Sequence, residues 1–145
     1  MGCISNLYFS QDKHSYRLLI NDAEKSSADS KIFLAKVNAD YQKTKRPIFL
    51  ALSGVGNFFL AKHSYNPFNK ISFFNKGKKM LDKAVELENN NLEIRFLRYI
   101  SQKKIPKILG YNQNLKEDES FLRKNYSKSK DAALVKEIKK YLNIK

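Results

Sequence analysis

Residues 52–91 read LSGVGNFFLAK (52–62), HSYNPFNKISF (63–73) and FNKGKKMLDKAVELENNN (74–91), and this stretch decides the fold. Its apolar residues recur at the helical period of about 3.6 on both sides of Asn66-Pro67, a dipeptide typical of turns. The stretch therefore predicts two helices, 47–61 and 72–88, folded against each other across a loop at 63–69. The asparagines at 89–91 suit the end of the second helix.

Gly54 and Gly56 lie inside the first of these helices, where each lowers helix propensity by roughly 1 kcal/mol relative to Ala. Close approach of a neighbouring helix would account for them. A glycine-rich phosphate loop is the alternative, but no strand pattern precedes the pair and no GK[ST] follows it. Because the helix is apolar on most sides, we expect it in the middle of a bundle.

Helical patterns continue in both directions, and no strand pattern competes with them. We predict a first helix from Asp12, a second capped by Asp29 or Ser30, a fifth over 91–103, a sixth after Asn114 and a last one capped by Asp131. The fold class is therefore all-α, a bundle or short superhelix of about six to seven helices. The predicted inward-facing residues include Tyr16, Ala23, Ile32, Phe33, Leu34, Val37, Tyr41, Leu81, Leu87, Ile94, Leu97, Leu122, Leu134, Ile138 and Tyr141.

The length of 145 residues fits one domain, and we assign residues 12–145 to a single helical domain. Residues 1–11 stand apart, because CISNLYFSQ (3–11) matches the end of an export signal cut before Asp12, without a basic leading region. The predicted compartment is the cytoplasm or, if residues 1–11 end a signal peptide, the periplasm. No apolar run approaches the roughly 18 residues of a membrane span.

The formal net charge of +14 rises along the chain, with +2 over residues 1–45, +5 over 46–100 and +7 over 101–145. Such a field attracts nucleic acid, anionic lipid headgroups or acidic proteins, although a solvated lysine-rich surface is the simpler interpretation. Arginine supplies only five of the 28 cations. Since arginine is the preferred residue for bidentate phosphate and base recognition, its scarcity weakens the nucleic-acid interpretation.

The sequence lacks the combinations of residues that catalysis or metal binding requires. The histidines are His14 and His63, the single cysteine is Cys3, and they form no nucleophile–base pair or metal-ligand spacing. We expect His63 to sit at a helix end, binding carbonyls or packing under aromatic neighbours. The acidic run 117–119 lacks the alternating ligands of a calcium loop and suits a helix start. We therefore predict a protein that is not an enzyme and holds no cofactor or metal.

Arg95 and Arg98 are the best candidates for a directed contact, because they lie three residues apart on one helix face. The alternative is an internal salt bridge to Glu117 or Asp118. Tyr99 and Tyr111 are predicted to line the same groove. We place the candidate partner-binding site where this face meets the 63–68 loop, with the residues His63, Tyr65, Phe68, Arg95, Arg98, Tyr99 and Tyr111.

The central helix pair resembles a tetratricopeptide repeat. Leu52, Val55, Gly56 and Phe59 match the first-helix signature, and Gly77, Leu81 and Ala84 match the second, while Asn89 stands where the family has a helix-ending proline. The predicted connector at 63–71 is longer than the family's tight turn, and the helix that follows fits poorly. One unit is present, about a quarter of the chain. The resemblance implies a module that binds a protein or peptide.

A second resemblance covers more of the chain. Residues 61–84 and 90–122, with their NPF, EIRFLR, LGY and KEDE elements, resemble an uncharacterised bacterial family of small helical proteins. Its members commonly begin with an export signal, which would fit FSQD at 9–12. The predicted function is thus a non-enzymatic binding or scaffold module for a protein or peptide partner. The alternative is a basic protein that binds nucleic acid or an anionic surface.

Overall fold

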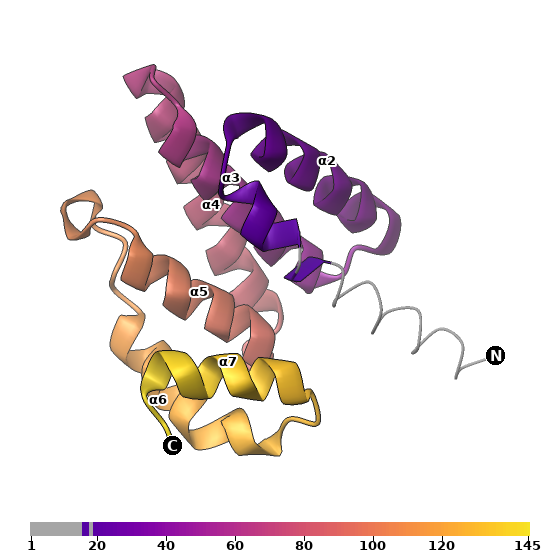
Figure 1. Ribbon diagram of the computed structural model, residues 1–145, viewed down its shortest axis with the longest axis vertical. Coiled ribbons are helices and arrows are strands. Elements are labelled where there is room, and N and C mark those ends of the chain that lie inside the picture. Colours follow the sequence, from indigo (N-terminus) through magenta and orange to yellow (C-terminus); the bar gives the residue numbers. More distant parts are fainter. Residues whose placement is uncertain (1–15, 18) are drawn as a thin grey trace.

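The computed structural model describes residues 16, 17 and 19–145, and these are helical with short connectors (Figure 1). The predicted all-α class is confirmed. Tyr16, Arg17 and residues 19–23 are also helical. The elements that follow are α2 (Ser27–Thr44), α3 (Pro47–His63), α4 (Pro67–Leu87), α5 (Leu92–Lys104), the 3-10 turn η1 (Lys107–Leu109), α6 (Leu115–Asn125), the 3-10 turn η2 (Tyr126–Lys128) and α7 (Ala132–Leu142). The predicted helix start at Asp12 and the N-terminal segment 1–11 lie outside the described residues.

Successive helices run back and forth and stack from α2 at one side of the molecule to α6 and α7 at the other (Figure 1). Helix α3 packs between α2 and α4, and α5 then packs on α3 and α4. Helices α6 and α7 complete the stack beyond α5. As a result, the α3–α4 turn and the loop after α5 lie along the same edge of the molecule, at the upper left of Figure 1.

Helix α3 is the most buried element, as its apolar sequence predicts, with a run of buried residues from Ile48 to Asn57. Gly54 and Gly77 let α3 and α4 cross at backbone contact, because a Cβ on either residue would stand 2.9 Å from the other's carbonyl oxygen. A Cβ on Gly56 would meet Leu34 of α2 at 3.1 Å. The predicted reason for the α3 glycines, close approach of neighbouring helices, is confirmed.

The start of α2 differs from the prediction. Ser26, and neither Asp29 nor Ser30, is the N-cap, and its Oγ accepts a hydrogen bond from the Asp29 amide at 3.0 Å. The Ser30 hydroxyl is buried and donates instead to the carbonyl of Ala23, which ties the first helix to α2. A serine can serve either purpose, and the packing of the two helices decides which one it serves.

The predicted loop at 63–69 and the helix start at Ser72 are also wrong. Helix α3 continues to His63, and α4 begins at Pro67 after a turn of three residues, 64–66. Asn66 Oδ1 accepts from the amides of Phe68 (2.9 Å) and Asn69 (3.3 Å). Asn66 is therefore the N-cap of α4 and Pro67 is its first residue, although the Asn-Pro dipeptide is also typical of turns.

Three predicted inward-facing residues are exposed: Ile32, Leu87 and, at 36%, Tyr141 of α7. Ile32 is 66% exposed because α2 is an outer helix that packs on α3 through Phe33 and Val37. Leu87, the last residue of α4, is half exposed. The remaining buried apolar residues form two cores. One joins the first helix to α2, α3 and α4, and the other joins α5, α6 and α7.

Candidate functional site

The predicted partner-contacting arginines form a buried cluster around Asp118. Arg95 Nε lies 2.7 Å from Asp118 Oδ1, and Arg98 donates through Nη2 to Oδ1 and through Nε to Oδ2, each at 2.8 Å. Gln102 Nε2 donates to Oδ2 at 2.9 Å. We call Arg95, Arg98, Gln102 and Asp118 the Asp118 cluster. The alternative prediction of an internal salt bridge is confirmed, mainly to Asp118, with Glu117 at 3.5 Å from Arg95.

The charged groups of the Asp118 cluster are paired with one another inside the protein. The Asp118 side chain is fully buried, and Arg95 and Arg98 are 3% and 5% exposed. Burial lowers the pKa of Arg98, but its hydrogen bond and charge interaction with Asp118 outweigh this, so that the pKa lies above its ordinary value. Arg95 also stacks on Phe121 at 4.3 Å and donates to Asn89. Buried charges paired in this way hold α5 and α6 together.

Tyr99 and Tyr111, predicted to line one groove, belong to different cores. Tyr99 is buried against α6 and α7, whereas Tyr111 packs against Phe58 and Phe74 of the α3–α4 hairpin. The Tyr111 hydroxyl donates to Asp82 Oδ1 at 2.8 Å. Burial, reinforced by the neighbouring Asp82 carboxylate, raises the pKa of Tyr111.

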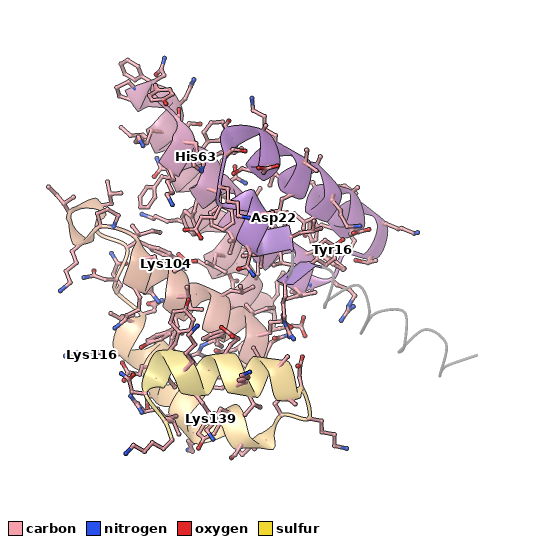
Figure 2. All side chains as sticks on the ribbon, viewed as in Figure 1. Tyr16, Asp22, His63, Lys104, Lys116 and Lys139 are labelled. Atoms are coloured by element: carbon pink, nitrogen blue, oxygen red, sulfur yellow. The ribbon has the colours of Figure 1, made fainter. Side chains whose placement is uncertain are left out.

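His63, Tyr65 and Phe68 belong to the α3–α4 turn and its flanking helix ends, at the tip of the hairpin and away from the body of α5 (Figure 1). Figure 2 labels His63 near this tip. Tyr65 is fully exposed and Phe68 is 83% exposed, while His63 Nε2 lies 2.7 Å from the carbonyl oxygen of Glu24. The structure therefore brings His63, Tyr65 and Phe68 together and separates them from the other four predicted residues.

The tip shares its edge with a second exposed apolar group, Ile108 and Leu109 of η1, of which Ile108 is 93% exposed. Glu24 joins the helix ends from which both groups project, since its carboxylate pairs with Lys62 of α3 (3.3 Å) and Lys104 of α5 (3.9 Å). We call the exposed residues of the two groups the apolar edge; they are Tyr65, Phe68, Ile71, Ile108 and Leu109.

The backbone under the apolar edge is anchored at its α3–α4 turn. Asn66 caps α4, and Lys70 Nζ reaches back to the carbonyl oxygen of Ala61 (2.8 Å) at the end of α3. His63 joins the same turn to Glu24. The aromatic side chains thus project from an anchored turn, with no part of the described chain covering them.

The two sequence segments that carry the apolar edge are rich in lysine and contain no acidic residue. Residues 47–81, which include α3 and most of α4, contain five lysines and no Asp or Glu. Residues 99–116, which include η1, contain four lysines and no Asp or Glu. Of these lysines, Lys62 and Lys104 pair with Glu24, and Lys70 donates to the carbonyl oxygen of Ala61. The edge therefore combines exposed apolar side chains with positive charge.

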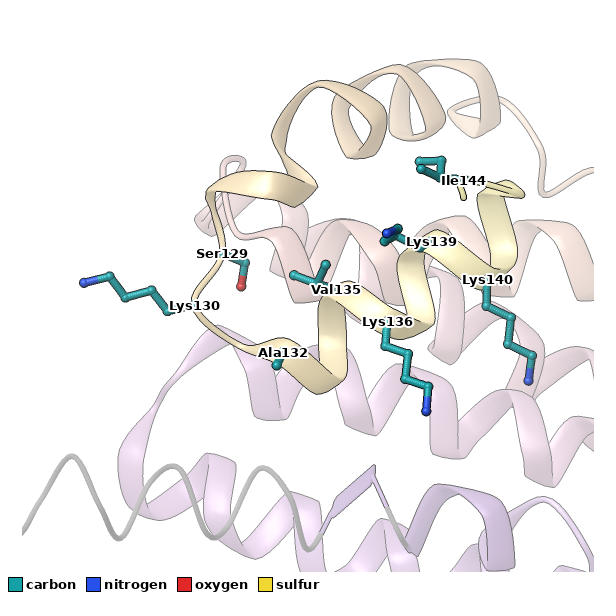
Figure 3. Close-up of a pocket in the computed structure, with 8 residues that line it drawn as sticks. All are labelled: Ser129, Lys130, Ala132, Val135, Lys136, Lys139, Lys140 and Ile144. Carbon is teal, nitrogen blue, oxygen red and sulfur yellow. The ribbon is translucent and has the colours of Figure 1, made fainter.

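A shallow hollow of about 550 Å³ lies along α7 and holds four lysines (Figure 3). The lysines point in different directions around Val135 rather than converging on one point. The hollow is lined by Ser129, Lys130, Ala132, Val135, Lys136, Lys139, Lys140 and Ile144. The four lysines agree with the excess of positive charge predicted for the C-terminal third, but their ammonium groups do not converge on one position where a ligand could bind.

Sequence reasoning missed Ile71, Ile108 and Leu109. Ile71 had been assigned to the end of a loop, and the pair 108–109 lies between Pro106 and Gly110, outside any periodic pattern. Two adjacent apolar residues in a basic connector were the available signal.

Within residues 16, 17 and 19–145, no three or more His, Cys, Asp or Glu side chains gather where a metal ion could bind. No helix in this part of the chain is long and apolar enough to cross a membrane. Comparison of the chain with protein-family models, with curated proteins and with solved structures found no match. The repeat-like and bacterial-family resemblances therefore remain resemblances, and the protein is a small all-helical protein.

Proposed function

We propose that the protein is a non-enzymatic helical binding module that meets its partner at the apolar edge. The observation that carries this proposal is the presence of five exposed apolar side chains on two turns along the same edge of the molecule (Figure 1). Water-exposed apolar groups are unfavourable for a free protein, and several of them on one edge are typical of an interaction site. The anchored α3–α4 turn supports the proposal because it fixes the backbone that carries Tyr65 and Phe68 before a partner arrives.

A protein or peptide partner is the candidate that the repeat-like hairpin predicts. The three-residue turn between α3 and α4 supports it, because tetratricopeptide hairpins have tight turns and the expected long connector is absent from this part of the chain. An anionic surface is the second candidate, supported by the lysine-rich, acid-free segments around the edge. Nucleic acid has less support, since Arg95 and Arg98 are occupied by Asp118.

The test is site-specific photo-cross-linking with the full chain in cells. A photoreactive residue is placed at Phe68 or Ile108, and at Ile32 as the matched control, since Ile32 is exposed and apolar but lies on α2, which carries none of the edge residues. We expect adducts, to protein or to lipid, at 68 and 108 and none at 32. Equal labelling at the three positions, or none at the edge, would contradict the proposal.

A further inference from the structure

Resting on the proposed function, we propose that the partner at the apolar edge is an anionic lipid bilayer. Phe68, Ile71 and Ile108 enter the headgroup–acyl boundary, Tyr65 and Leu109 lie beside them, and the surrounding lysines meet the lipid headgroups. The protein would thus lie on a membrane surface without spanning it.

The shape of the edge is the first argument. Its side chains protrude from two turns, whereas a peptide-binding groove is concave and lined by partly covered residues. Tyr65 is fully exposed and Ile108 is 93% exposed, so neighbouring side chains form no pocket around them that could hold a residue of a partner protein. Two separate projections can enter one flat bilayer together. Tyrosine and phenylalanine also favour the membrane–water interface, because they combine an apolar ring with tolerance of the polar boundary.

Charge complementarity is the second argument. The two projections lie in segments, 47–81 and 99–116, whose charged residues are all Lys or Arg. Lys107 is exposed directly beside Ile108 in sequence, whereas Lys70, between Phe68 and Ile71, is bound to the carbonyl oxygen of Ala61. A lysine has a long apolar stem and a strongly hydrated head, so it can lie along an inserted aromatic while its ammonium group stays at anionic headgroups.

The composition of the edge favours lipid over nucleic acid. Tyr65 and Phe68 could stack on bases, but Ile71, Ile108 and Leu109 have no ring with which to stack. Aliphatic side chains gain mainly from transfer into an apolar medium, which a bilayer supplies and a phosphate backbone does not. The arginines that would recognise phosphate are in the Asp118 cluster.

The test uses the absence of tryptophan from the sequence. Phe68→Trp introduces a single fluorescent reporter at the edge, and Ile32→Trp introduces the matched control on α2. Each full-length variant is mixed with phosphatidylcholine vesicles, with vesicles in which roughly a third of the lipid is phosphatidylglycerol, and with a single-stranded oligonucleotide. With the anionic vesicles we expect a blue shift and protection from an aqueous quencher at position 68 only. Salt should weaken the response, because the initial attraction is electrostatic.

A second variant separates insertion from simple attraction. In a sedimentation assay with the anionic vesicles, the double change F68S/I108S should lower binding by about tenfold or more, whereas Ile32→Ser should leave it unchanged. Equal binding by the double variant, or no response of the tryptophan at 68, would overturn the proposal. A response to the oligonucleotide in place of vesicles would do the same. If the protein does not bind the vesicles but photo-cross-linking at 68 and 108 captures a protein, the proposed binding module is retained and the proposal of a lipid partner is rejected.

Discussion

The Asp118 cluster and the apolar edge show two opposite outcomes for residues that resemble binding-site residues in sequence. Arg95 and Arg98 are the most ligand-like side chains of the chain, yet they are 3% and 5% exposed and bound to a carboxylate of the same molecule. Phe68 and Ile108 resemble core residues, yet they are 83% and 93% exposed. A residue's chemistry indicates what it can bind, whereas the availability of an internal partner decides whether it is free for an external one.

Removing the carboxylate of the Asp118 cluster should have the largest effect. Asp118→Ala removes the buried carboxylate that both guanidinium groups share and leaves only the longer contacts of Arg95 with Glu117 and of Arg98 with Asp82. Loss of a buried charge partner typically lowers the free energy of unfolding by about 3–5 kcal/mol. Urea unfolding followed by circular dichroism measures the loss. Asp118→Asn, which keeps the side-chain shape, serves as the milder variant if the alanine form does not fold.

Glu117 provides the control for this prediction. It precedes Asp118 in α6 and contacts Arg95 at 3.5 Å, but its side chain is 67% exposed. Glu117→Ala should therefore change stability by no more than about 0.5 kcal/mol. Similar losses for the two variants would mean that the cluster is not the internal, partner-satisfied unit that distinguishes it from the edge.

The helical stripes made the fold predictable, because a buried face repeats along a helix whatever its neighbours are. Phe33, Val37, Leu81 and Ile94 are buried as their spacing predicts. The helix starts were less predictable, because Asn66-Pro67 is compatible both with a turn and with the start of a helix. Sequence could therefore place the α3–α4 hairpin but overestimated the length of its turn.

The candidate site was less predictable than the fold because it depends on contacts distant in sequence. Asp118 lies 23 residues from Arg95, and only the packing of α6 on α5 brings them together. Ile108 and Leu109 lie in a connector without periodicity, where no pattern separates covered apolar residues from exposed ones. Tyr65 and Phe68 were predicted for the site, and their exposure fits that prediction without testing it.

Gly77→Ala should have the next largest effect, in the hairpin that carries the apolar edge. The added Cβ would stand 2.7 Å from the Phe58 ring and 2.9 Å from the Gly54 carbonyl oxygen, so α3 and α4 must move apart. We expect a loss of about 1–3 kcal/mol by urea unfolding. The loss should add to that of Asp118→Asn, because the two sites share no partner. A neutral effect would show that the helix crossing is looser than the structure has it.

Alkaline pH should reduce the contribution of Tyr111 to stability, because the phenol ionises in the unfolded chain before it ionises in the folded protein. The pKa of Tyr111 is raised in the folded protein, so its stabilising contribution is complete below the unfolded value of about 10 and falls as the pH rises above it. The urea midpoint of the wild type should therefore fall more between about pH 8 and pH 11 than that of Tyr111→Phe, which has no phenol to ionise. Equal decreases would contradict the assignment, and the comparison between variants removes the common effect of lysine deprotonation.

Substituting the apolar edge itself should have the smallest effect on stability. Tyr65→Ser with Phe68→Ser removes two aromatic rings that contribute little to either core, so the free energy of unfolding should stay within about 0.5 kcal/mol of the wild type. Phe33→Ala, at a buried position, should lose about 3–5 kcal/mol in the same assay. A loss above about 1 kcal/mol for the double variant would mean that the rings pack on the molecule in solution. The edge would then resemble the Asp118 cluster, with its binding groups satisfied by the chain itself, and the contrast from which both proposals start would disappear.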